Sequence, residues 1–292
     1  MRRFAMKTLA IAVTALFVSA GAAVGQDNNA DVDQEGDNLT AEVAQPGADN
    51  RASVDQFNDN TGPEEALIRQ AGNHNRAVIE QSQTGGGNVT PPLDATIRQA
   101  GNHNVATQSQ TAPGFNSGQT SEAVQSGNRN RSNQLITGGH TIRQFVRQSG
   151  NHNIARQTSG GAHLDATINS SGNSNTAIQE QSGTNHTASI RQPGNSNRAT
   201  QDQSAGLSTH FNDASIAQPG SHNRASQTQI MLSGGAPPHY NAASVRQTGN
   251  WNRAVQSQEG FDLTTTIRQS GNSNMANTMQ VGSNDTATIT QN

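Results

Sequence analysis

QAGNHNRAVIEQ, at residues 70 to 81, determines how the rest of the chain is interpreted, because variants of it recur throughout. QPGADNRASVDQ at 45 to 56 and QTGNWNRAVQSQ at 247 to 258 are two further complete copies. One variant or another of the motif QxGxxNxAxxxQ occurs ten times between residues 45 and 280. A polar motif that repeats at a short period is typical of solenoid proteins.

Each copy predicts a strand, a turn and a second strand. On both sides of a Gly/Asn cluster, aliphatic residues, Ala or Gln recur at every second position. This period of two is the pattern of two β-strands joined by a turn. Gly takes positive φ without steric cost, and the Asn residues that follow it also tolerate the left-handed region. The position two residues before the first Gln is aliphatic in the copies, as at Val43, Ile68 and Ile97, and we call this series the aliphatic ladder.

We expect the Gln, Gly and Asn of the motif to stack in ladders, because side-chain amides in register can each donate and accept a hydrogen bond along the axis. The ladder positions are Gln45, Gln70, Gln99, Gln125, Gln148, Gln192, Gln218, Gln247 and Gln269; Gly47, Gly72, Gly101, Gly127, Gly150, Gly172, Gly194, Gly220, Gly249 and Gly271; and Asn50, Asn75, Asn104, Asn130, Asn153, Asn175, Asn197, Asn223, Asn252 and Asn274.

The repeat sets the size of one rung. The first and last Gln of a copy are 11 residues apart, and the same half-unit returns out of phase, as in QSGTNHTASIRQ at 181 to 192. One rung is therefore about 22 residues. The first turn has constant length, whereas the second accepts insertions such as TGGGNVTPP at 84 to 92. The sequence predicts an all-β, two-sheet parallel β-solenoid of about ten rungs, with loop insertions, that forms amyloid.

Residues 1–25 have the order of a secretory signal peptide. Basic residues, including Lys7, precede an apolar stretch from Leu9 to Val18, and small residues follow. We expect cleavage near Gly25. The predicted domains are a signal peptide at 1–25, a short acidic segment at 26–33 and the repeat array at 34–292.

The chain after the signal peptide is acidic and lacks cysteine. It contains 15 Arg and no Lys against 21 Asp and Glu, and 11 of these acids lie between Asp27 and Glu65. This balance does not indicate a nucleic-acid binder. The absence of cysteine excludes a disulfide framework and thiol chemistry. Low hydrophobic content would suggest disorder, but a disordered tract has no reason to keep one phase ten times.

The combination of Gln, Gly, Asn, Ala and Gln in each copy resembles the curlin repeat, the building unit of curli, the amyloid fibres on bacterial surfaces. The resemblance covers residues 34 to 292. It implies a secreted, extracellular subunit of a cell-surface fibre that serves cell adhesion and biofilm matrix. It also implies three kinds of partner: the chain itself in a fibre homopolymer, a nucleator subunit, and an outer-membrane secretion pore.

Some features depart from the usual curlin pattern. The array has more repeats than curlins commonly carry, and fewer aromatic residues occupy the turns. The acidic segment lacks the Gly-rich pattern seen at the start of the typical major subunit, so recognition by the same pore stays open. The last half-unit, at 280 to 291, contains no Arg or Lys, which favours a major fibre subunit over a minor nucleator.

Two motifs suggest metals, and each has a plainer interpretation. DVDQEGDNLTAE at 31 to 42 fits a calcium loop, but it also coincides with the first half-unit, and no helical pattern flanks it. Its ligand positions would be Asp31, Asp33, Glu35, Gly36 and Glu42. A recurring turn position holds His74, His103, His152 and His222, but Asp49 or Trp251 in other copies. We expect exposed turn residues there and no metal site.

Arginines form two broken lines beside the turn. One line precedes the first Gln (Arg69, Arg98, Arg147, Arg191, Arg246 and Arg268), and the other follows the second turn Asn (Arg51, Arg76, Arg131, Arg198, Arg224 and Arg253). They indicate either a solvated face that discourages lateral aggregation or a surface for anionic polysaccharide.

Catalysis finds no support, because Ser, His and Asp occur at repeat positions and no copy differs as a unique active site would. We therefore expect no enzyme and no cofactor. A monomeric solenoid adhesin that binds a repetitive glycan or ice is the alternative. Its motivation is the outward Thr residues expected at 263 to 267 and 286 to 290.

Overall fold

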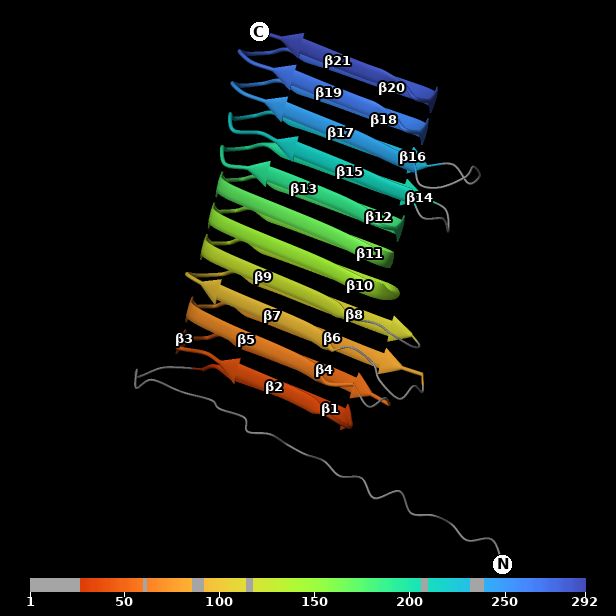
Figure 1. Cartoon of the computed structure of the whole chain (residues 1–292). Helices are drawn as coiled ribbons and strands as arrows, with labels where there is room; N and C mark the ends of the chain where they lie inside the picture. The colour runs from red at the N-terminus through yellow and green to blue at the C-terminus, as the bar shows by residue number, and fades with distance from the viewer. Residues whose placement is uncertain (1–26, 60–61, 86–91, 114–117, 206–209, 232–238) are drawn as a thin grey trace, which may run out of the picture.

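The computed structural model describes residues 27–59, 62–85, 92–113, 118–205, 210–231 and 239–292. The predicted signal peptide lies outside these residues. Within them the chain is built of β-strands joined by turns (Figure 1). None of them belongs to a helix long and apolar enough to cross a membrane.

The strands form two stacks, which we name sheet I and sheet II. Sheet I contains β1 (Asn29–Gly36), β4 (Arg51–Asn58), β6 (Arg76–Thr84), β8 (Val105–Pro113), β12 (Thr176–Thr184), β14 (Arg198–Ala205), β16 (Arg224–Met231), β18 (Arg253–Phe261), β20 (Met275–Ser283) and the first halves of β10 (Arg131–Asn151) and β11 (Ile154–Asn173). Sheet II contains β2 (Leu39–Ala44), β5 (Glu64–Asn73), β7 (Leu93–Ala100), β9 (Gln119–Asn128), β13 (His186–Gln192), β15 (His210–Ala217), β17 (His239–Gln247), β19 (Thr264–Gln269), β21 (Thr286–Gln291) and the second halves of β10 and β11. The two-residue β3 (Gly47–Ala48) lies in a turn and pairs with β5.

Every pairing within a sheet is parallel and joins equivalent repeat positions. Ala52 pairs with Ala77 in sheet I, and Ile68 pairs with Ile97 in sheet II. One sheet I strand and the following sheet II strand make a rung, so the predicted parallel β-solenoid of about ten rungs is confirmed. The described residues form eleven such rungs, because β1 starts at Asn29, inside the predicted acidic segment, and pairs with β4.

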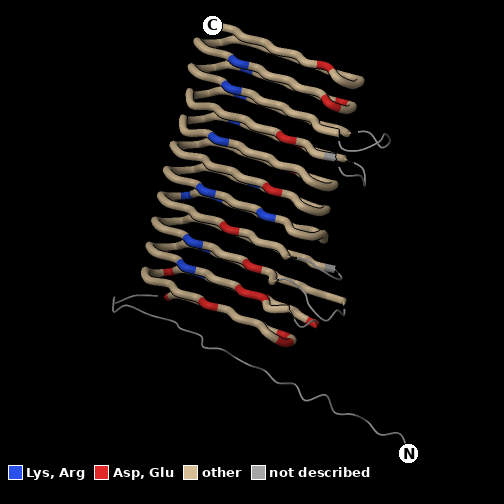
Figure 2. The backbone as a smooth tube through the Cα atoms, viewed as in Figure 1, with Lys and Arg blue, Asp and Glu red and all other residues tan. Residues whose placement is uncertain are grey.

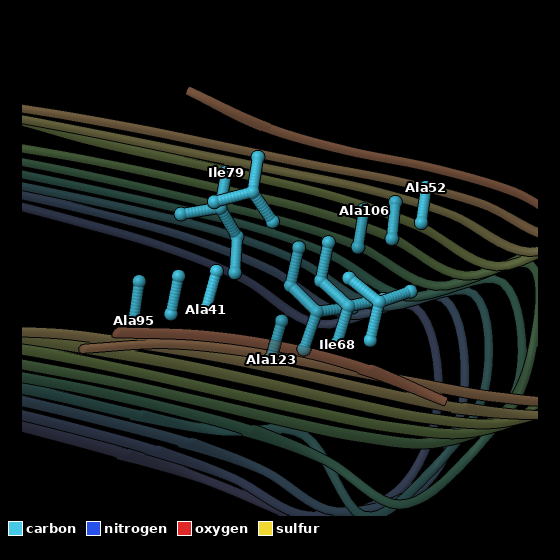
Figure 3. Close-up of a cluster of buried hydrophobic side chains, with 12 residues drawn as sticks. Ala41, Ala52, Ile68, Ile79, Ala95, Ala106 and Ala123 are labelled. Carbon is cyan, nitrogen blue, oxygen red and sulfur yellow. The ribbon is translucent and has the colours of Figure 1, made fainter. Parts of the chain in front are cut away.

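The core is a thin layer between the two sheets. Side chains alternate between buried and outward positions along the straight part of the inner strands, as in β4, where Ala52, Val54 and Gln56 are buried. Figure 3 shows Ala52 and Ile79 pointing inward from one sheet toward Ala41 and Ile68 of the other. The aliphatic ladder of the sequence is this central column of sheet II, in which Ile68, like its neighbours, is fully buried.

The two long edges of the solenoid differ. At the tight-turn edge, a sheet II strand passes to the sheet I strand of the next rung through the conserved-length Gly/Asn turn. At the variable edge, the two strands of one rung are joined. The internal gaps between the described ranges all fall, in sequence, between a sheet I strand and the sheet II strand that follows it. They are residues 60–61, 86–91, 114–117, 206–209 and 232–238. Differences in loop length therefore leave the stacking register unchanged.

Candidate functional site

The turn glycine is required both for its backbone conformation and for close stacking. Gly72 has a φ of +100°, a region that residues with a Cβ rarely adopt. A Cβ on Gly72 would lie 2.2 Å from the carbonyl oxygen of Gly101 on the next rung. The tight turns therefore stack backbone on backbone, with no room for a side chain.

The residue two positions after the glycine is also left-handed, although it is not glycine. Its φ is 57° at His74, 56° at Arg129 and 61° at Trp251. The turn Asn residues tolerate this conformation, but in the tight turns the residue between the two Asn takes it, whereas Asn38, Asn185 and Asn284 take it in the out-of-phase half-units. What the varied residues at this position share is a positive φ and a side chain at the rim of the turn.

The second Asn of each turn joins three rungs. The backbone N–H of Asn75 donates to Asn50 Oδ1 at 2.9 Å, and Asn75 Nδ2 donates to the carbonyl oxygen of Gly101 at 2.8 Å. Asn75 Oδ1 in turn accepts the backbone N–H of Asn104 at 2.9 Å. The side chain is buried, so these bonds satisfy groups that water does not reach.

The first Asn of the turn forms a second, exposed ladder that the sequence interpretation missed. The backbone N–H of Asn73 donates to Asn102 Oδ1 at 2.9 Å, and that of Asn102 donates to Asn128 Oδ1 at 3.0 Å. The signal was present in the sequence, because the turn reads Gly-Asn-x-Asn in eight copies.

The motif glutamines form two buried columns with one direction. In the first, Gln45 Nε2 donates to Gln70 Oε1, and Gln70 Nε2 donates to Gln99 Oε1, both at 2.8 Å. The same bond continues through Gln125 to Gln148, is interrupted at Ser170, and resumes from Gln192 to Gln291. The second column starts with Gln34, whose Nε2 donates to Gln56 Oε1 at 2.7 Å.

A third glutamine column lies between the other two and was not predicted. Gln157 Nε2 donates to Gln179 Oε1, and Gln179 Nε2 to Gln201 Oε1, both at 2.9 Å. The column runs from Gln108 to Gln256, whereas Val54 and Ile79 occupy its place in earlier rungs. The repeated Gln-x-Gln spacing in the second half of each copy was the signal for it.

The amide columns end at the two terminal rungs. Among the described residues, no strand pairs with the outer edge of β1 and β2 or with that of β20 and β21. Gln45 Oε1, at the start of its column, is buried and has no hydrogen-bond partner. At the other end, Gln291 Nε2 donates to the backbone oxygen of Met275 at 2.9 Å. One end thus offers acceptors and the other end offers donors.

These turns and columns are the features that a family comparison recognises. A family model of the curlin-associated repeat matches residues 25–57 and 241–271, near the two ends of the stack. The chain is a curlin-repeat protein. None of the curated proteins matches it. The curlin repeat belongs to structural fibre subunits and not to an enzyme family.

The residues of the calcium-loop motif form two strands of the curlin-repeat array. Asp31 and Asp33 face outward on β1, and Glu42 lies on β2 of the other sheet. The helices that flank a calcium loop of this type are therefore absent from residues 29–44. Among the described residues there is no group of three His, Cys, Asp or Glu side chains placed to hold a metal ion.

The turn histidines of the curlin-repeat protein make ring and polar contacts at the rim. His74 and His103 stack with ring centroids 4.8 Å apart, and His222 stacks on Trp251 at 4.2 Å. His74 Nε2 lies 3.3 Å from Asp49 Oδ2. These stacks extend the tight-turn edge outward by one layer of side chains.

One carboxyl lies inside the rod. Glu64 is fully buried on β5, and neither of its carboxylate oxygens has a hydrogen-bond partner. Burial raises the pKa of Glu64 to about 8. In the same column, Leu39 precedes it and Leu93 follows it.

Outward charges of opposite sign lie near opposite long edges of the solenoid. Both arginine lines flank the tight-turn edge, and most acids lie nearer the variable edge (Figure 2). Several acids stack in register with one another. The pKa values of Asp94 and Asp202 are raised by partial burial and further by the carboxylates of Glu65 and Glu180, respectively.

The predicted outward threonines are only partly outward. Thr264 and Thr266 point outward, but Thr265 between them is buried. Hydroxyl side chains do line one outward column of sheet II over its last six rungs. They are Thr167, Ser189, Ser215, Ser244, Thr266 and Thr288.

Proposed function

We propose that this curlin-repeat protein is the fibre-building subunit of an extracellular, curli-like amyloid. It polymerises head to tail through its terminal rungs and serves cell adhesion and biofilm matrix on the bacterial surface. A nucleator subunit and an outer-membrane secretion pore are the partners that this role requires.

The single direction of the glutamine columns carries the proposal. Each Nε2 points toward the C-terminal rung and each Oε1 toward the N-terminal rung, so the orphan acceptor Gln45 Oε1 needs a donor from outside the chain. Gln291 Nε2 of a second copy is such a donor. Joining two like ends would instead place donors against donors or acceptors against acceptors, which leaves buried amides unpaired.

The junction also matches in register. If β20 of one copy takes the place of a strand that precedes β1 of the next, Ala276 lies against Ala30 and Gln280 against Gln34. In sheet II, Ile289 lies against Val43 and Gln291 against Gln45. The aliphatic, alanine and glutamine columns then continue across the junction as they do between internal rungs.

The experiment follows fibre growth of the mature chain with and without seeds. We expect dye-binding fibres with a reflection near ~4.8 Å, the spacing between hydrogen-bonded strands, and a lag that seeds remove. Purified protein that stays monomeric for days with seeds present contradicts the proposal.

A proline variant tests the direction of growth. In a parallel ladder the N–H groups of successive residues point to opposite edges of the strand. Asn29 donates its N–H to Asn50 on the next rung, so the N–H of Ala30 points to the open edge. Ala30→Pro therefore blocks only the acceptor end. Added together with wild-type monomer to wild-type seeds, it should attach to one fibre end and stop growth there under a microscope, whereas Thr40→Ala on the same rung should leave both ends active.

Binding of a repetitive glycan or ice by the monomer is a second candidate, which the hydroxyl column of sheet II supports. A blank result in thermal-hysteresis and glycan pull-down assays removes it.

A further inference from the structure

The outer face of sheet I sorts its charges into two columns. The Arg column lies next to the tight-turn edge and contains Arg51, Arg76, Arg131, Arg198, Arg224 and Arg253. The acid column lies nearer the variable edge and contains Asp33, Asp55, Glu80, Glu180 and Asp202. Within the described rungs, the Arg column holds no acid and the acid column holds no base.

The two columns cannot neutralise each other within one rod. Arg51 and Asp55 lie four residues apart on β4, which corresponds to about 13 Å along a strand. Among the described arginines, the one in an ion pair is Arg98, whose Nη1 lies 2.7 Å from Glu122 Oε1 on sheet II. Both columns of sheet I therefore present charges without a partner of opposite sign.

Between these columns runs a central column that suits close packing. β-branched residues occupy it on five rungs (Val78, Thr107, Ile178, Thr200 and Val255). Arg156, on β11, is the basic residue in this column, and Asp31 on β1 is the acidic one. The face thus has a mainly uncharged centre with opposite charges on its two sides.

A two-fold axis parallel to the rod brings opposite charges together. Such a rotation places the Arg column of one rod over the acid column of a second copy, and it keeps both rods pointing in the same direction. Rung faces rung, so Arg51 meets Asp55, Arg76 meets Glu80 and Arg198 meets Asp202 of the second copy. Because each pair occurs twice, three rungs supply six ion pairs.

We propose that sheet I is a lateral interface at which two parallel rods of this chain pair face to face around this axis. Sheet II does not offer the same fit, because β10 carries Arg143 and Arg147 there, and the rotation would place one over the other. A linear polyanion would match the Arg column alone and would be repelled by the acid column. A second copy satisfies both columns, which favours it over a polyanion.

The inference rests on the proposed function, since the rods that pair are fibres. Measuring the fibre mass per length by electron microscopy distinguishes a failure of the proposed function from a failure of the pairing. A chain that forms no fibres fails the proposed function, whereas wild-type fibres with the mass of one rod at low salt overturn only the pairing. We expect two rods per fibre at low salt, and separation at about 1 M salt, where the screening length falls to roughly 3 Å.

Charge-reversal variants test the pairing itself. The triple variant Asp55→Arg, Glu80→Arg, Asp202→Arg should give single rods. Adding Arg51→Glu, Arg76→Glu and Arg198→Glu should restore the double rods, which shows that the variants fold. A triple variant that keeps the mass of two rods overturns the proposal.

Arg156 distinguishes the two kinds of partner. It would face its own copy across the two-fold axis, so Arg156→Thr should keep the rods paired at higher salt than wild type. A sedimentation assay with sodium alginate, run in parallel, measures binding of a polyanion. If Arg156→Thr binds alginate more weakly and the mass per length is unchanged in every variant, the face binds a polyanion and the proposal is overturned.

Discussion

Glu64 pairs in parallel register with Leu93 on the next rung, and both side chains are fully buried. A carboxyl therefore occupies a position that leucine fills on either side, at Leu39 and Leu93. Burial raises its pKa from the usual 4.5 to about 8, so the folded chain holds this carboxyl protonated at neutral pH.

We predict that Glu64 makes the fold less stable as pH rises from about 4.5 to about 8. Below this window Glu64 is protonated in both the folded and the unfolded state, so it adds no pH dependence to the free energy of unfolding. Within it the unfolded state ionises first, so the free energy of unfolding falls by at most about 1.4 kcal/mol per pH unit. Urea unfolding of wild type and Glu64→Leu from pH 4 to 9 measures it. Glu64→Leu should lack this slope, and equal slopes in both proteins would contradict the prediction.

The turn glycines should differ in their tolerance of alanine according to what lies on the next rung. Gly101 and Gly271 both have positive φ, but a Cβ would lie 2.2 Å from Gly127 O at Gly101 and no closer than 3.3 Å to any neighbour at Gly271. The backbone strain of about 1–3 kcal/mol is common to both, so Gly101→Ala should lower the unfolding free energy by more than Gly271→Ala. Equal losses in urea unfolding would show that close stacking is unimportant.

An interior glutamine should matter more than the outward residue beside it. Gln201 accepts from Gln179 Nε2 and donates to Gln227 Oε1, both at 2.9 Å. Gln201→Ala leaves one N–H of Gln179 and Oε1 of Gln227 unpaired in the core, which should cost about 1–3 kcal/mol for each group. Thr200→Ala, on the outer face, should change stability by less than about 0.5 kcal/mol. Thermal unfolding of the two variants compares them, and similar midpoints would refute a role for the column.

The two asparagines of one turn offer a further matched pair. Asn130 is buried and bonds to Asn104, Asn153 and Gly150, whereas Asn128 is exposed. Asn130→Ala should destabilise the fold by about 1 kcal/mol or more beyond Asn128→Ala, because water replaces the lost bonds only at the exposed site. Hydrogen exchange at the tight-turn amides provides the measurement, and faster exchange in Asn128→Ala would reverse the order.

The repeat allowed the fold to be predicted because each rung buries the same positions. The phase of Ile68 and Gln70 is enough to place both sheets, both edges and the parallel register. The direction of the Gln45–Gln70 bond was not predictable, since a stacked amide satisfies the pattern in either orientation. The third glutamine column was missed because Val54 and Ile79 occupy it in the first copies. The charge columns of sheet I needed the structure, which shows which outward residues lie side by side.

The left-handed residue at the turn tip escaped prediction for a different reason. His74, Arg129 and Trp251 share no chemistry, and each has a Cβ that disfavours positive φ. The hydrogen bonds of the flanking Asn residues impose this conformation from outside, so the identity of the tip residue carries no signal.

Because most internal rungs present the same columns above and below, many of them can follow one another. Unequal recombination within the coding sequence could therefore delete or duplicate a rung and leave a chain whose new neighbours already fit. Loop differences at the variable edge would travel with each rung. The length of such a subunit is a quantity that genomes can change in single steps without passing through a misfolded protein.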